Sequence, residues 1–129
     1  LLLADSTHLT EALYNLLTNG YEATVASGRP DRKVALAVHD ERLWVVFEVR
    51  DNGCGMTRQE QKKIYDPFYT NKNTNFNWGM GLYYVCQIVK SHLGALRVES
   101  VKNEGTSFFM QLPRYTPRVD TALQRRQSK

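Results

Sequence analysis

Two glycine-broken segments, the first led by an aspartate, constrain this chain more than any other feature. Residues 51–56 read Asp-Asn-Gly-Cys-Gly-Met, and residues 78–82 read Trp-Gly-Met-Gly-Leu. Residues 43–49 have the composition of a strand, so Asp51 should emerge at its end. Glycines at alternate positions allow close approaches that a residue with a Cβ resists. The chain can therefore lie against a flat ligand beside a fixed carboxylate, and a nucleotide pocket is the first hypothesis.

Neither segment is decisive alone. Asp-Asn-Gly is also typical of a plain turn, because Asn and Gly both tolerate positive φ. Gly79 and Gly81 also fit a simple hinge or the entry turn of a helix. They do not complete a dinucleotide-binding fingerprint, since Tyr84 stands where the third glycine should be and no βαβ unit surrounds them.

The segment before these glycines predicts a helix over about residues 6–27. Its core-facing side is formed by Leu9, Leu13, Leu16, Leu17 and Gly20. At about 100° per residue, Glu11, Asn15, Asn19 and Glu22 gather in one sector of the other side. Asn is a poor helix-interior residue, so Asn15 and Asn19 one turn apart require a reason. Either they hold a hydrated Mg²⁺, which takes oxygen ligands, or both amides face solvent.

These residues resemble the ATP-binding catalytic domain of sensor histidine kinases, in the superfamily that also holds gyrase-type topoisomerases and mismatch-repair ATPases. The resemblance covers nearly the whole chain and rests on five motifs in the order that the family has them. They are an N box in residues 8–23, a first glycine box in 51–56, a phenylalanine box in 66–72, a second glycine box in 79–82 and a closing motif in 105–112.

The resemblance implies roles for individual residues. Asp51 would accept a hydrogen bond from the exocyclic amine of adenine, and Thr106 would support it from the neighbouring strand. Asn19, with Asn15, would hold Mg²⁺ against the phosphates. Lys72 would contact the terminal phosphates. The remaining nucleotide-binding positions that the resemblance implies are Gly53, Gly55, Gly79, Gly81 and Leu82. The plain alternatives are that Lys72 is a surface lysine and Thr106 an ordinary strand threonine.

One departure from the wider superfamily bears on mechanism. Its ATP hydrolysers carry a glutamate one helical turn before the metal-binding asparagine, and here Asn15 occupies that place. A neutral amide is no general base, and Glu11 lies a further turn away, about 6 Å along the axis. We therefore expect ATP to be bound better than it is hydrolysed, as suits a kinase that donates the γ-phosphoryl group to a histidine on a separate domain.

Local signals give the rest of the organisation. We expect a hairpin over residues 33–39 and 43–50, then a short helix from a capping box at Thr57 to about Tyr65. Residues 71–77 have no period and are rich in Asn, which predicts a mobile loop. The resemblance implies that this loop is the ATP lid, with Phe68, Tyr69, Phe76 and Trp78 near it. A core-facing helix ended by Gly94 and a second hairpin, residues 95–101 and 106–112, complete the chain. The predicted fold is an α+β two-layer sandwich. A mixed, mostly antiparallel sheet of about five strands would pack on three helices.

Composition sets the remaining expectations. The 129 residues make one domain, with the ATP-binding part over 1–115 and a polar, basic, disordered tail over 116–129. A net charge of +4 with dispersed Lys and Arg argues against nucleic-acid binding. Two lone cysteines and no long apolar run favour a cytoplasmic location without direct membrane contact.

The implied partners lie outside this chain. They are ATP with Mg²⁺, a phosphoacceptor histidine domain of the same parent protein and then a response regulator. The three histidines each have a structural explanation, so none is expected to be the phosphoacceptor, and the fragment is expected to be monomeric. Two other functions remain open: a serine kinase of the anti-sigma type, and a degenerate interaction module that no longer binds nucleotide.

Overall fold

The computed structural model describes residues 5–64, 81–114 and 124–126. Its elements, in chain order, are α1 (Ser6–Ser27), β1 (Val34–Asp40), β2 (Trp44–Asp51), α2 (Arg58–Lys63), α3 (Gly81–Ser91), β3 (Ala95–Val101) and β4 (Gly105–Pro113). Of the predicted disordered tail, residues 124–126 are helical, and the rest lies outside the described residues.

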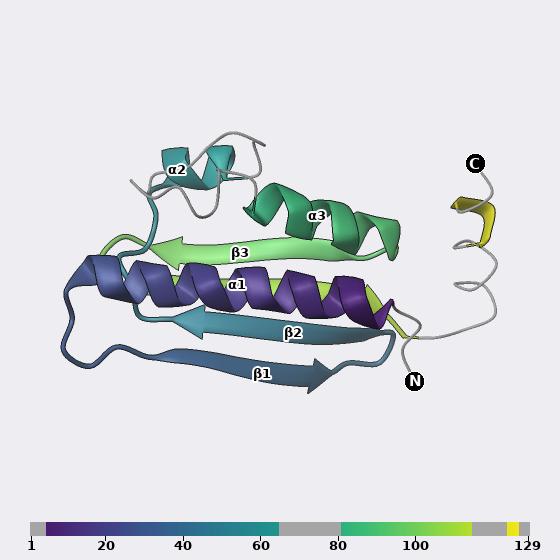
Figure 1. The fold of residues 1–129 in the computed structure, drawn as a ribbon, viewed down its shortest axis with the longest axis horizontal. Coiled ribbons are helices and arrows are strands. Elements are labelled where there is room, and N and C mark those ends of the chain that lie inside the picture. Colours follow the sequence, from purple (N-terminus) through teal and green to yellow (C-terminus); the bar gives the residue numbers. More distant parts are fainter. Residues whose placement is uncertain (1–4, 65–80, 115–123, 127–129) are drawn as a thin grey trace.

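The strands form one sheet in the order β1-β2-β4-β3, with α1 and α3 on one of its faces (Figure 1). This confirms the predicted two-layer α+β sandwich. Within the described residues the sheet has one strand fewer than the predicted number of about five, and it is not mixed. Four strands pair there, each antiparallel to its neighbours. The reason is that two hairpins supply all of these strands.

Helix α1 has the predicted bounds because both ends are capped. The Asp5 side chain accepts a hydrogen bond from the His8 amide at the start, and Gly28 ends the helix with φ of +71°. The most deeply buried side of α1 is Ala12, Leu16, Gly20 and Thr24. The buried side of α1 is therefore rotated about the helix axis from the predicted one. Three of the leucines predicted to face the core pack half-buried beside it, namely Leu9, Leu13 and Leu17.

The core lies between this helical layer and the sheet. Its buried members are Ala12, Leu16, Val49, Ile64, Val85, Ile88, Val89, Phe108, Met110 and Leu112. On β4 the buried side chains alternate with half-buried ones, which is the period of a strand with one covered face. This alternation places Thr106 on the same face as the core.

The two shorter helices end differently from prediction. The capping box of Thr57 and Glu60 is confirmed, but α2 ends at Lys63 because buried Ile64 forms its C-cap. After α3, Leu93 rather than Gly94 takes the left-handed conformation, with φ of +62°. Gly94 is required for another reason, since a Cβ there would lie 2.2 Å from the Gln111 carbonyl oxygen.

His92 joins the two main helices and is not the cation that its position near a helix C-terminus suggests. Its Nδ1 lies 2.8 Å from the Ile88 carbonyl oxygen, and its Nε2 accepts a hydrogen bond of 3.0 Å from the Asp5 amide. An acceptor Nε2 carries no proton, so Nδ1–H donates to Ile88 and the ring is neutral. The side chain is 9% exposed and connects the start of α1 to the end of α3.

The sheet face away from the helices carries a buried carboxylate. Glu48 accepts from His39 Nε2 at 2.7 Å and pairs with the Arg50 guanidinium at 3.0 Å. The His39 hydrogen bond, with the Arg50 charge adding to it, holds the pKa of Glu48 below its ordinary value of 4.5. Folding therefore favours the ionised carboxylate.

A pH dependence of stability follows from this shift. Because the folded-state pKa is lowered, the contribution of Glu48 is fully present well above pH 4.5 and is lost as pH falls through the folded-state value. In urea unfolding at a series of pH values, Glu48→Gln should show a flatter acid branch than wild type. Parallel branches for the two proteins would contradict this account.

Candidate functional site

The predicted base-reading pair lies at one end of the sheet. Asp51 is the last residue of β2, and its register partner on β4 is Thr106. Each is 6% exposed, and both point toward the helical layer, because Val49 and Phe108, the next pair on that face, belong to the core. A carboxylate and a hydroxyl therefore sit side by side in a water-poor environment.

The Asp51 carboxylate is held by backbone on two sides. Its Oδ1 accepts a hydrogen bond of 2.8 Å from the Gly53 amide. On the other side, a Cβ at Gly20 of α1 would lie 3.4 Å from Asp51 Cβ and 3.5 Å from Oδ2. Gly20 thus lets α1 pass close to the carboxylate, which fixes the side chain in one orientation.

The glycines of the first glycine box fit against the protein's own backbone. A Cβ at Gly53 would lie 2.5 Å from the carbonyl carbon of Ala23, where the Cys54 amide donates to the Ala23 carbonyl. Gly55 has φ of +66°, and a Cβ there would lie 2.0 Å from the Val101 carbonyl oxygen. These glycines bring the loop into contact with α1 on one side and the β3–β4 turn on the other.

Asn52 fastens the same loop to the segment before β1. Its Oδ1 accepts from the Lys33 amide at 2.8 Å, and its Nδ2 donates to the Asp31 carbonyl at 2.7 Å. The chain bends at Gly53 and Cys54 after the strand, and within this segment only Gly55 has a positive φ. The hydrogen bonds of Asn52 hold this bend beside the buried Asp51 carboxylate.

The two asparagines of α1 are half-buried and one turn apart. Asn15 Nδ2 donates to the Glu11 carbonyl at 2.8 Å, which leaves its Oδ1 directed toward α3, where a Cβ at Gly81 would lie 3.3 Å from it. An amide oxygen in this position suits Mg²⁺, which needs few protein ligands. No group of three or more His, Cys, Asp or Glu side chains that could hold a metal occurs within the described residues.

Helix α3 makes a second contact with α1, at Glu11, one helical turn before Asn15. The Tyr84 hydroxyl donates to Glu11 Oε2, and this hydrogen bond raises the pKa of the Tyr84 phenol. Since α1 and α3 run in opposite directions, Asn15 lies beside Gly81 and Glu11 beside Tyr84 (Figure 1). The Glu11 carboxylate is thus engaged by a neighbouring helix.

The structure brings most of the predicted site residues into two groups joined by α1. Asp51, Gly53, Gly55 and Thr106 lie at the sheet end, and Asn15 lies beside Gly81. Leu82 packs its side chain against the core. Lys72 and Gly79, like the predicted lid and its aromatic residues, lie outside the described residues.

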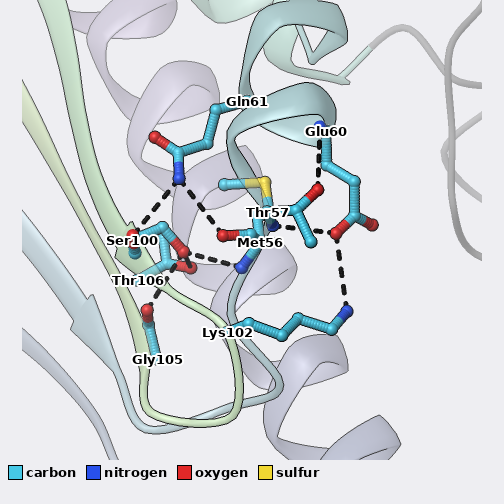
Figure 2. A network of polar contacts seen from close by, with 8 residues as sticks. All are labelled: Met56, Thr57, Glu60, Gln61, Ser100, Lys102, Gly105 and Thr106. Carbon is cyan, nitrogen blue, oxygen red and sulfur yellow. Dashed lines mark hydrogen bonds and ion pairs between the residues drawn. The ribbon is translucent and has the colours of Figure 1, made fainter.

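A polar network behind Thr106 was not predicted from sequence. Figure 2 shows Ser100 at its centre, with hydrogen bonds to Thr106 Oγ1 at 2.7 Å, the Met56 amide at 2.8 Å and the Gly105 carbonyl at 3.1 Å. Gln61 Nε2 adds bonds of 3.2 Å to the Met56 and Ser100 carbonyls. Strand register was the signal that could have found Ser100, because it pairs with Thr106 across the second hairpin.

Comparison with known families gives a match over most of the chain. Residues 4–116 match the family described as histidine kinase-, DNA gyrase B-, and HSP90-like ATPase. The sensor protein RprX of Bacteroides fragilis is 34% identical over 119 residues, covering 85% of this chain. The signal transduction histidine-protein kinase AtoS of Escherichia coli is 36% identical over 110 residues, also covering 85% of this chain.

Solved structures give the same result. The mycobacterial sensor histidine kinase MprB aligns with a TM-score of 0.74 and 26% identity, covering 89% of this chain and 76% of that one. A nucleotide-free catalytic domain of the histidine kinase ThkA aligns with a TM-score of 0.75 and 28% identity, covering 92% and 73%. This chain spans only 22% of the length of RprX and 17% of that of AtoS.

Proposed function

The chain belongs to the family of histidine kinase-, DNA gyrase B-, and HSP90-like ATPases, and from this premise we propose that it binds Mg-ATP and donates the γ-phosphoryl group to a histidine on a separate domain of a two-component sensor kinase. The observation that carries the proposal is the buried Asp51 carboxylate, which lies beside Thr106 at one end of the sheet. Gly20 of α1 packs close to this carboxylate. The carboxylate and the hydroxyl are held side by side by adjacent strands.

That pair supports adenine as the base. The exocyclic amine of adenine is a donor, whereas guanine carries a carbonyl oxygen at the same position. A buried carboxylate facing that oxygen would lose its partner and meet a second acceptor, which is costly. Recognition by a pre-organised carboxylate therefore gives selectivity as well as affinity.

The phosphates would lie at the other group of residues. Asn15 and Asn19 would hold Mg²⁺, and when bound the ion would neutralise phosphate charge. The backbone amides of residues 79–82 and the Lys72 ammonium would add donors. Nucleotide would thus span from Asp51 to Gly81 along α1.

Two features favour phosphoryl transfer over hydrolysis. The position one turn before Asn19 holds the neutral Asn15, and Glu11 is engaged by Tyr84. Neither is suited to activate water as a general base. A serine kinase of the anti-sigma type, which usually keeps a carboxylate at the Asn15 position, fits this sequence less well, and a degenerate module fits the retained Asp51 and Asn19 poorly.

The partners follow from this role. They would be the phosphoacceptor domain of the parent protein and a response regulator, with the fragment itself monomeric and working in the cytoplasm. Among the helices that the structure describes, none combines the length and apolarity needed to cross a bilayer.

Metal-assisted binding tests the proposal. In wild type, Mg²⁺ should strengthen binding of a fluorescent, non-hydrolysable ATP analogue by about tenfold or more. Asn19→Ala should abolish most of this gain, because one of the two amide ligands is lost. Binding without Mg²⁺ should change little. Thr18→Ala, the adjacent position on α1, is the matched control. An unchanged Mg²⁺ effect in Asn19→Ala would remove Asn19 from the metal site.

A further inference from the structure

Ser100, Thr106 and Asp51 form one row across three strands. Ser100 of β3 is the register partner of Thr106 on β4, and Thr106 is the partner of Asp51 on β2. Thr106 is 6% exposed, and its hydroxyl lies 2.7 Å from Ser100 Oγ. The group that stands next to the base-reading carboxylate is therefore itself held from behind by a second hydroxyl (Figure 2).

The neighbours of Ser100 Oγ fix the direction of that hydrogen bond. The Met56 amide can only donate to Oγ, and the Gly105 carbonyl can only accept from it. Ser100 has one proton, so a bond to Gly105 uses it. The remaining contact, with Thr106, is then a hydrogen bond only if Thr106 donates. This assignment gives each of the three contacts one proton.

We propose that Ser100 is a positioning residue for base selectivity. Its Oγ accepts the hydrogen bond that the Thr106 hydroxyl donates, so Thr106 has only lone pairs to offer the ligand. The inference rests on the proposed nucleotide-binding function and deepens it. Asp51 and Thr106 then present two acceptors side by side, which match an amino group and reject a carbonyl oxygen.

Without Ser100 Oγ, the Thr106 hydroxyl is free to rotate and donate. It can then satisfy a carbonyl oxygen such as that of guanine as readily as an amine. Discrimination between the bases should fall, even where affinity for the adenine nucleotide is largely kept. If Ser100 served only to hold the loop, its loss would weaken the binding of both nucleotides equally.

The test is the ratio of dissociation constants for non-hydrolysable GTP and ATP analogues, measured by calorimetry with Mg²⁺. Ser100→Ala should lower the GTP-to-ATP ratio by about tenfold, the factor expected for one hydrogen bond of ordinary strength. Ser100→Thr keeps the hydroxyl and should restore the ratio. Ser107→Ala, next to Thr106 on β4 but on the opposite face, should leave it unchanged.

A second variant keeps the test sharp if Ser100→Ala folds poorly. Thr106→Val, which keeps the shape but removes the hydroxyl, should lower the ratio, and adding Ser100→Ala should not lower it further. An unchanged ratio in Ser100→Ala, or an additive effect in the double variant, would overturn the proposed role of Ser100 and leave the proposed nucleotide binding intact. Failure of wild type to bind either analogue would instead remove the proposed function, and this inference with it.

Discussion

Asp51→Asn is expected to weaken binding of a non-hydrolysable ATP analogue by about 100-fold, which corresponds to about 2.7 kcal/mol. The substitution is isosteric, but it removes the charge and places a donor where the carboxylate offers only acceptors. If the amide oxygen keeps the Gly53 hydrogen bond, the amide nitrogen replaces Oδ2, beside Gly20. A donor at that position cannot accept from the adenine amine.

Calorimetric titration of the variant against wild type measures this loss. The matched control is Glu48→Gln, a buried carboxylate three residues earlier on the same strand that points to the opposite face. At neutral pH this control should bind as wild type does. Equal affinities of Asp51→Asn and wild type, with both folded by circular dichroism, would exclude Asp51 from base recognition.

Gly55→Ala should destabilise the fold by about 2–5 kcal/mol. A left-handed conformation costs a residue with a Cβ about 1–2 kcal/mol. In addition, the new Cβ would lie 2.0 Å from the Val101 carbonyl oxygen and 2.7 Å from its carbon. Backbone atoms cannot rotate away as a side chain does, so the loop must move, at a further cost of about 1–3 kcal/mol or more.

Urea unfolding of Gly55→Ala beside Gly28→Ala separates these two costs. Gly28 also has a positive φ, of +71°, but a Cβ there would meet no atom within 4 Å. Gly28→Ala should therefore lose only the conformational cost, about 1–2 kcal/mol. Similar losses in the two variants would show that the close approach of Gly55 to Val101 is not a constraint.

Helix α1 and the two hairpins were predictable because their signals are local. Asp5 and Gly28 stand at cap positions, and the alternation of strand residues in β4 is visible in the sequence. The predicted position of Asp51 at the end of a strand is confirmed for the same reason. Capping and periodicity depend on neighbouring residues only, so a single sequence contains them.

Other features depend on which distant residues meet, and the sequence did not predict them. The close approaches of Gly53 to Ala23 and of Gly55 to Val101 are two examples. His92 Nε2 accepts a hydrogen bond from the Asp5 amide, 87 positions away, and no local pattern predicts this contact. Ser100 gained a role only through its register with Thr106. Tertiary contacts of this kind leave no periodic signal.

The central claim, that this chain binds an adenine nucleotide with Mg²⁺, is tested most directly by calorimetric titration of the wild-type chain. A non-hydrolysable ATP analogue is titrated with and without Mg²⁺, and a GTP analogue is added as competitor. The account predicts saturable binding that Mg²⁺ strengthens and that the GTP analogue competes for poorly. Absence of binding at millimolar ligand would contradict it and leave an interaction module of the same fold.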